Sequence, residues 1–507
     1  MAQFQTIDLF AGPGGLAEGF SAVKEDSGVR AFNIALSVEK EDAAFATLRL
    51  RSFCRKFQAL PPEYYQYIDG NITLQELRSA HEDEWRSASE ETMQLELGTA
   101  HASKLLAPRL DAMRSKYGNQ TILVGGPPCQ AYSLAGRSRN RGITGYTPEG
   151  DHRHYLYKEY IAILSRLAPA CFVMENVKGF LSSRVAGARI FDQVIADLES
   201  AGGASGSYKI IALSGVSSGD SKDFIVRSED HGIPQSRHRV ILVGFRTDIV
   251  RFSDQDALNL KLAAVDEPLS VSTVLAEMPP LRSGLSRADD PQAWREATVA
   301  ALRTAAMACE SEREILGTIA AKLLETAALI EVTKPMPRIS RQLGGVGDPV
   351  LAAWLNDPKL EQLSLHESRS HMIGDLSRYA FCAVFADVFG RSPKSIEFPA
   401  ALAPSHENWS TGIFADRFRV QRWGAPSSTI TSHISKDGHY FIHPDARQCR
   451  SLTVREAARL QTFPDNYHFE GNRTQQYVQV GNAVPPLLAF KIAAKVRTFL
   501  AQHATFQ

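Results

Sequence analysis

The feature of the sequence that most constrains the fold is a regular alternation over its first half. Short apolar, β-branched runs alternate there with helical patterns. Strands that alternate with helices of about 10–15 residues are typical of a mainly parallel, doubly wound α/β sheet. Such a sheet gathers its ligand sites at the carboxyl ends of its strands. The runs that predict strands are 6–10, 34–38, 122–124, 171–174, 209–213 and 239–245.

Two segments interrupt this alternation. Residues 73–120 are charged and helix-forming, and we expect them to be a surface insertion between strands. From 247 to 420 the alternation stops, which indicates a second, smaller domain. We therefore predict a large domain at 1–246, completed by residues 470–507, and a small domain at 247–469.

Composition narrows the class of protein. Lys plus Arg and Asp plus Glu both total 56 in 507 residues, so the formal net charge is zero. A binder of nucleic acid that relies on overall positive charge is excluded, although a locally basic groove is not. Neither a membrane span nor a signal peptide is expected. Six scattered cysteines without a CxxC pair argue against a zinc ribbon and a disulfide framework. We expect an intracellular protein without a metal.

The first strand–helix turn reads DLFAGPGG over 8–15. Its glycines would let the backbone approach a ligand closely and aim the start of the helix at it. Glu39 closes the next strand, where an acidic residue can bind ribose hydroxyls. The turn and Glu39 together predict a cofactor of the adenosine type. Their spacing does not distinguish NAD from S-adenosylmethionine. A simple tight turn is the alternative interpretation.

A second motif, GGPPCQ over 125–130, follows the strand at 122–124. Two glycines and two prolines stiffen this loop and place Cys129 near its tip. A thiol at the ligand edge of a parallel sheet is a candidate nucleophile, whereas a lone cysteine elsewhere is more often a small core residue. The next eighteen residues hold three arginines and no acid. They could close over a polyanion, or form an ordinary solvated loop.

Two further strands carry polar residues at their ends. CFVMENV, over 171–177, ends in Glu175 and Asn176, and a carboxylate there can act as a general acid or as a structural cap. In QSRHR, over 235–239, alternation would place Gln235, Arg237 and Arg239 on one face. Two guanidinium groups could then converge on a site, although a surface ion-pair strand is an equal alternative.

Taken together, these motifs resemble the cytosine-5 DNA methyltransferases. DLFAGPGG, GGPPCQ, ENV and QSRHR are followed in the family order by LTVREAARLQTFPD at 452–465 and QVGNAVPP at 479–486. The resemblance covers about residues 4–246 and 426–500, and the combination of GGPPCQ, ENV and VGNAVPP is highly specific. It implies a Rossmann-like methyltransferase fold that uses S-adenosylmethionine, with a target-recognition region at 247–420.

The resemblance also implies catalytic roles. Cys129 would attack carbon 6 of a flipped-out cytosine, and Glu175 would hold and protonate ring nitrogen 3. Arg239 would anchor the base and its carboxylate partner, with Arg237 in the same catalytic set. A methyl group would pass from S-adenosylmethionine to carbon 5 and leave S-adenosylhomocysteine. The residues expected to bind the substrate are Gln130, Ser133, Asn176 and Gln235.

The resemblance also implies a set of residues that bind the cofactor. Phe10 would lie against the adenine, Glu39 would bind the ribose, and Asn482 would close the pocket. Asn71 stands where the family has an acid for the adenine amino group, unless the register slips and Asp69 serves instead. The full expected set is Phe10, Gly12, Gly14, Leu16, Glu39, Asn71, Ile72, Pro127, Leu156, Asn482 and Ala483.

The hypothesis is therefore a bacterial DNA (cytosine-5-)-methyltransferase, a cytoplasmic monomer that acts on double-stranded DNA, paired with a restriction endonuclease. A tRNA cytosine-5 methyltransferase would share the catalytic motifs, but the long segment 247–420 favours duplex DNA. An inactive DNA-binding relative is disfavoured by the complete catalytic set. Arg417, Arg419 and Arg422, with Trp423, could contact phosphates, or form an exposed basic strand.

Overall fold

The computed structural model describes residues 3–128, 156–185, 188–216, 218–253, 255–310, 316–405, 409 and 416–505. Its centre is an eight-stranded sheet in the order β3-β2-β1-β4-β5-β11-β8, with β9 also paired to β11. All neighbours are parallel except those of β11, which runs antiparallel to β5, β8 and β9. The predicted mainly parallel sheet is confirmed. The strands are β1 (Phe4–Leu9), β2 (Phe32–Glu39), β3 (Thr92–Gln94), β4 (Thr121–Gly125), β5 (Cys171–Val177), β8 (Tyr208–Ile211), β9 (Ile225–Arg227) and β11 (His238–Arg246).

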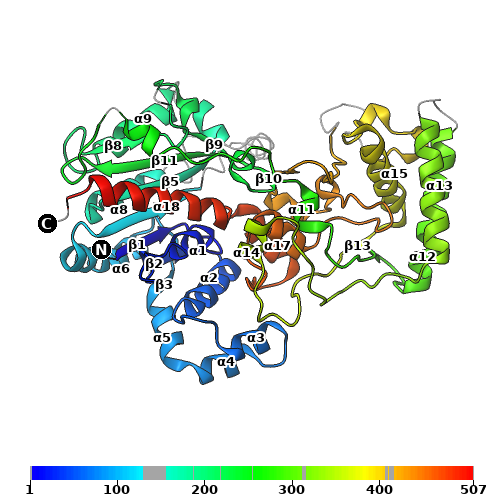
Figure 1. The fold of residues 1–507 in the computed structure, drawn as a ribbon, viewed down its shortest axis with the longest axis horizontal. Coiled ribbons are helices and arrows are strands. Elements are labelled where there is room, and N and C mark those ends of the chain that lie inside the picture. Colours follow the sequence, from blue (N-terminus) through cyan, green and yellow to red (C-terminus); the bar gives the residue numbers. More distant parts are fainter. Residues whose placement is uncertain are drawn as a thin grey trace.

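Helices cover both faces of this sheet (Figure 1). The central strands are apolar on both sides, as buried parallel strands are: in β5, Cys171 and Val173 enter one core cluster, and Phe172 and Met174 enter the other. The first cluster includes α1 (Gly15–Ser21) and α18 (Pro486–His503). The second includes α6 (Ala100–Tyr117), α8 (Leu156–Leu167) and α9 (Ile190–Glu199).

Two glycines of α1 let the C-terminal helix lie directly on it. A Cβ atom at Gly15 would stand 2.2 Å from the Val484 carbonyl oxygen, and one at Gly19 would stand 2.4 Å from the Phe490 nitrogen. Any larger residue would push α18 away from α1. This packing brings the residues just before α18 to the first strand–helix turn, although they lie more than 460 positions further along the chain.

The expectation of a surface insertion at 73–120 is wrong. This segment supplies β3, which pairs with β2, and α6, whose Leu106 and Leu110 are buried against the sheet. β3 has only three residues and follows charged helices, so the sequence shows no recognisable strand pattern there. The preceding helices are α2 (Asp42–Cys54), α3 (Pro62–Ile68), α4 (Leu74–Ala80) and α5 (Glu82–Glu91).

After β11 helices dominate, and three of them pack around an apolar core of their own. These are α12 (Pro291–Glu310), α13 (Gly317–Val332) and α15 (Ile373–Phe389), which stand at the opposite end of the molecule from the sheet in Figure 1. We call them the helical lobe. Shorter helices are α10 (Asp256–Asn259), α11 (Val271–Leu275), α14 (Pro349–Leu355), α16 (Val454–Leu460) and α17 (Arg473–Asn482).

Small strand pairs complete the structure. β10 (Gln235–Ser236) pairs with β14 (Ser427–Ser428) and links the sheet to the segment after the helical lobe. The other pairs are β6 (Arg184–Val185) with β7 (Ala188–Arg189), and β12 (Gly284–Leu285) with β13 (Ser370–His371). Among the residues that the structure describes, no helix is both long enough and apolar enough to cross a membrane.

Candidate active site

The ends of β5 and β11 bring Glu175 and Arg239 together. In this antiparallel pair Arg239 lies opposite Val177, so Glu175 is its diagonal neighbour on the same face. Glu175 Oε1 is 2.6 Å from Arg239 Nε, and the two side chains are 14% and 12% exposed. The carboxylate is thus held in one orientation while remaining open to a ligand.

The loop after β4 lies against this carboxylate. A Cβ atom at Gly126 would stand 2.9 Å from Glu175 Oε2, so a side chain there would disturb the ion pair. Asn176 Nδ2 donates to the Pro127 carbonyl oxygen at 3.4 Å and ties the loop to β5. The expected positions Cys129, Gln130 and Ser133 lie outside the described residues.

Arg237 and Gln235 do not join Arg239 at Glu175. Arg237 is 1% exposed and donates to the carbonyl oxygens of Ile430, at 2.8 Å, and Gly481, at 3.3 Å. Burial, together with the charge of Arg239, lowers the pKa of its guanidinium group. Gln235 donates to the Leu460 carbonyl oxygen at 3.2 Å.

The expected convergence of two guanidinium groups is therefore not found. The Arg237 backbone N–H donates to the Gln235 carbonyl oxygen at 2.9 Å, and this tight turn separates β10 from β11. Strict strand alternation ends at such a turn, so the three side chains no longer share a face. Gln235 and Arg237 instead join the sheet to the segments around Ile430, Leu460 and Gly481.

The turn after β1 forms the other half of the site. Phe10, Gly12 and Gly14 have φ angles of 54°, 57° and 99°. This left-handed conformation is unusual for phenylalanine, and strain of that kind concentrates at functional sites. Glu39 Oε2 accepts from the Gly12 N–H at 2.7 Å, while its Oε1 accepts from the Lys40 and Glu41 N–H groups at 2.8 Å.

Asp8 was missed by sequence reasoning as a separate group. It is 0% exposed and lies just before this turn. Neither of its carboxyl oxygens has a hydrogen-bond partner. Burial, opposed by the nearby charge of Arg55, raises the pKa of Asp8 to about 8. The sequence places an acid in DLFAGPGG, but only the structure shows that it is buried and unpartnered.

The C-terminal residues reach the same turn. Val484 lies against Gly15, as described above, so Asn482 and Ala483 are held close to it. Asn482 is exposed at the end of α17, whereas Ala483 is 5% exposed. Leu16 is buried in α1, and Leu156 is buried at the start of α8. The structure thus gathers most of the expected cofactor set at the ends of β1 and β2.

Asn71 and Ile72 are exceptions. They occupy the turn between α3 and α4, where Asn71 is exposed, and Figure 1 shows these helices away from the carboxyl ends of β1 and β2. The strand beside β2 is β3, and the Leu95 N–H donates to the Glu39 carbonyl oxygen at 3.0 Å. Glu96 follows directly. Residues 94–96 therefore lie beside Glu39, although they belong to the run 73–120 that we expected to be an insertion.

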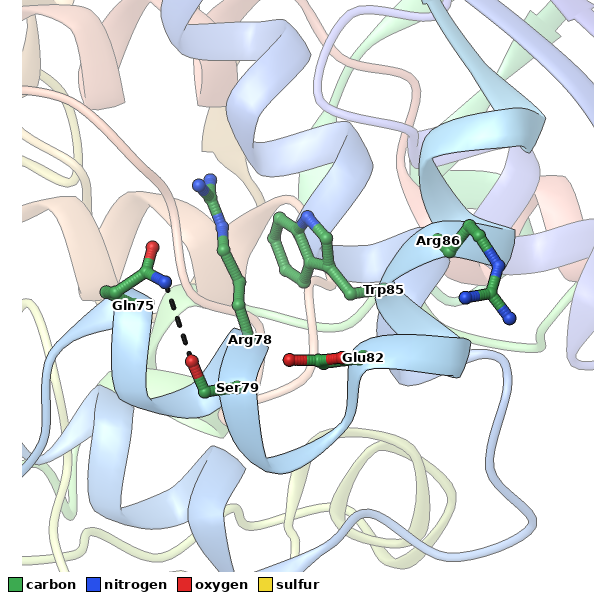
Figure 2. Close-up of a pocket in the computed structure, with 6 residues that line it drawn as sticks. All are labelled: Gln75, Arg78, Ser79, Glu82, Trp85 and Arg86. Carbon is green, nitrogen blue, oxygen red and sulfur yellow. Dashed lines mark hydrogen bonds between the residues drawn. The ribbon is translucent and has the colours of Figure 1, made fainter.

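A shallow hollow of about 220 Å³ between α4 and α5 is not part of this site. Figure 2 shows Arg78 beside Trp85, with the guanidinium carbon 4.5 Å from the ring centre, and Gln75 bonded to Ser79. Its side chains come from two surface helices and none comes from a strand end. We therefore place the candidate site at the strand ends.

The chain is similar to known proteins. The model of the C-5 cytosine-specific DNA methylase family matches residues 109–498. The type II methyltransferase M.Bpa9945I of Bacillus paralicheniformis is 32% identical over 98% of this chain and 99% of that protein. M.AgeI of Thalassovita gelatinovora is 25% identical over 98% of this chain and 100% of that protein.

A solved structure shares the fold. A prophage-encoded E. coli protein assigned as a DNA modification methyltransferase superposes with a TM-score of 0.53 at 19% identity, covering 98% of this chain and 100% of that one. The family match and the full-length relatives confirm the resemblance drawn from the motifs. The chain belongs to the C-5 cytosine-specific DNA methylases and is a DNA (cytosine-5)-methyltransferase.

Proposed function

We propose that this enzyme methylates cytosine within one short sequence of double-stranded DNA, as the modification partner of a restriction endonuclease. The observation that carries the proposal is the Glu175–Arg239 ion pair beneath the loop that leads to Cys129. The full-length relatives named type II methyltransferases support the setting. The same setting implies action in a bacterial cytoplasm, and we propose that the enzyme works as a monomer.

The base-side chemistry follows from the electronics of cytosine. Carbon 5 is too electron-poor to take a methyl group directly, and neither face of a stacked base is reachable, so the base must leave the duplex. The Cys129 thiolate would form a bond to carbon 6 while Glu175 supplies a proton to nitrogen 3. Carbon 5 then becomes nucleophilic. After methylation the carbon 5 proton leaves to a base, the sulfur–carbon bond breaks to release the Cys129 thiolate, and nitrogen 3 returns its proton to Glu175.

The other cysteines do not compete for this role. The five described cysteines are all buried, and burial raises the pKa of Cys54 to about 11 and also raises those of Cys171 and Cys382. A buried thiol of raised pKa is seldom a thiolate at neutral pH. Arg239 keeps Glu175 in place, so it acts on the base through that carboxylate. Asn176 and Pro127 hold the loop against it.

The cofactor side fits a cationic adenosine derivative. Two carboxyl groups lie at the ends of β1 and β2, and Asp8 has no hydrogen-bond partner of its own. When bound, S-adenosylmethionine supplies the methyl group. Phe10, the glycine turn, Glu39 and the segment at Asn482 would hold it, with Leu16, Leu156 and Pro127 completing the pocket. We assign the adenine amino contact to Glu96 in preference to Asn71.

Bisulfite sequencing of plasmid DNA from cells that express the enzyme tests this proposal. We expect cytosine methylation confined to one short sequence, lost completely with Cys129→Ala. Cys382→Ala, which changes a buried thiol of α15, is the matched control and should keep the methylation pattern. Unmodified DNA despite folded protein would contradict the proposal, as would normal turnover by Cys129→Ala.

A further inference from the structure

We propose that Arg422 and Trp423 form a binding site for the DNA sugar–phosphate backbone, on the edge of the helical lobe. Arg422 would contact a phosphate, and Trp423 would offer its ring to the adjoining sugar. This inference rests on the proposed action on duplex DNA, and it adds a contact that lies away from the catalytic residues.

A hollow marks the site. A cavity of about 260 Å³ separates α15 from the segment at 420–424. Ala383, Ala386 and Gly390 form one wall, and their small size leaves the space open. Val420, Arg422 and Trp423 line the opposite side. The hollow therefore combines an apolar floor, an aromatic ring and a cation, which suits a sugar–phosphate unit better than a purely apolar ligand.

Charge separates Arg422 from its neighbours. Arg417 pairs with Asp437 at 2.8 Å, and Arg419 pairs with Asp416. Arg422 is exposed and donates to the Gly390 carbonyl oxygen, and within the described part of the chain it has no ion pair. Of the three arginines singled out in the sequence, Arg422 is thus the one whose charge no carboxylate offsets.

The acid that shares the hollow does not oppose an anion. Asp387 of α15 lies on the same wall, but its Oδ2 is 2.6 Å from Lys322 Nζ of α13. This pair offsets the carboxylate charge, so the positive charge of Arg422 dominates locally. Arg and Lys side chains supply many of the phosphate contacts in protein–DNA complexes.

The aromatic side of the hollow is held firmly. The Trp423 carbonyl oxygen accepts from the Ser272 N–H at 3.0 Å, and the Ala425 carbonyl oxygen accepts from the Val271 N–H at 2.9 Å. The Trp423 ring meets the His443 ring edge-on, with centroids 5.5 Å apart. A ring fixed in this way loses little entropy when a ligand packs on it.

The segment is also continuous with the base site. Trp423 lies four residues before β14, which pairs with β10 through Gln235 and Ser427. β10 leads through Arg237 into β11, which carries Arg239. Strand pairing therefore connects the segment that carries Arg422 and Trp423 to the strand that carries Arg239.

Salt dependence of DNA binding tests the proposal. Affinity of the full-length enzyme for a duplex containing its methylated sequence is measured at several salt concentrations, with S-adenosylhomocysteine present. Loss of one phosphate contact should reduce the slope of log K against log salt by about 1 in magnitude. We expect this for Arg422→Gln, and less than half of it for the matched controls Arg417→Gln and Arg419→Gln. Trp423→Leu should weaken binding about tenfold at every salt concentration without changing the slope.

The outcomes are separable. If wild-type enzyme neither methylates nor binds duplex DNA, the proposed function fails and this inference fails with it. If wild-type enzyme methylates DNA but Arg422→Gln keeps the full slope, or all three arginine variants change it equally, only this inference is overturned. Thermal unfolding of each variant identifies a fold defect. Trp423→Phe provides a second, milder change if Trp423→Leu does not fold.

Discussion

Asp8 and Glu175, near the ends of their strands, are held less completely than the charged side chains of the helix α16. In α16, Arg455, Glu456 and Arg459 are all at 0% exposure, and each is hydrogen-bonded within the protein. Glu456 accepts from Arg450 at 2.6 and 2.7 Å, and Arg459 donates to Asp465 at 2.7 and 2.9 Å. At the strand ends, Glu175 remains partly open, and Asp8 is buried without a partner.

The two regions differ in pKa as well as in geometry. Burial alone would raise the pKa of Glu456, but Arg450 outweighs it and holds that pKa well below its usual range. For Asp8, burial prevails and the pKa rises to about 8. Glu456 is thus held as a charge by partners within the protein, whereas Asp8 lacks such a partner and is a candidate for contact with a ligand.

The largest expected effect tests the role of Glu175 in methyl transfer. Glu175→Gln keeps the shape of the side chain but removes its acid, so methyl transfer in a single turnover should fall about 10³-fold. Thermal stability should fall less than for a fully buried pair, because both side chains of the Glu175–Arg239 pair keep some contact with solvent. S-adenosylhomocysteine affinity should change little, because Glu175 lies on the base side of the proposed site. Lys178→Gln, on the segment just after β5, is the control and should keep the rate. A Glu175→Gln enzyme with the wild-type rate would remove Glu175 from the mechanism.

The structural side is tested by Glu456→Gln. Breaking a buried ion pair leaves Arg450 uncompensated, and we expect a loss of about 3–5 kcal/mol in the free energy of unfolding. Urea denaturation measures this loss. The double variant Arg450→Met with Glu456→Leu should recover much of it, since no charge is left unpaired. A Glu456→Gln protein as stable as wild type would show that the fold does not depend on the Arg450–Glu456 ion pair.

Asp8 gives a prediction in pH. Its pKa is raised from 3.8 to about 8 on folding, so the folded state binds this proton more tightly and stability falls as the pH rises between those values. Without cofactor, the advantage of Asp8→Asn over wild type should grow by on the order of 3 kcal/mol from pH 5 to pH 8. Urea unfolding of both proteins at the two pH values gives the difference. An advantage independent of pH would mean that Asp8 ionises normally in the folded protein.

Much of the sheet could be predicted because its strands are apolar on both faces and its glycines lie at turns. The site residues on these strands were also predictable, since Glu39 and Glu175 each end a recognisable run. Other features depend on contacts between distant segments. No local pattern shows that Arg237 binds the Gly481 carbonyl oxygen, or that α18 rests on Gly15 and Gly19.

The part of the proposed cofactor site near the adenine shows most clearly what the sequence alone could not predict. β3 is a three-residue edge strand, too short to give a periodic signal, and it owes its place to pairing with β2. Asn71 matches the family motif in the sequence, but it lies in an exposed turn between α3 and α4. Tertiary pairing, not local sequence, puts residues 94–96 beside Glu39.

The smallest expected effect tests this last assignment. Glu96 follows β3, and its exposed carboxylate pairs with Lys40 Nζ at 3.7 Å. Glu96→Gln should weaken S-adenosylhomocysteine binding about threefold to tenfold, because a charge-assisted hydrogen bond becomes a neutral one. Asn71→Ala should leave the affinity unchanged in the same calorimetric titration. The reverse result, with Asn71→Ala weakening binding and Glu96→Gln not, would return the adenine contact to the turn between α3 and α4.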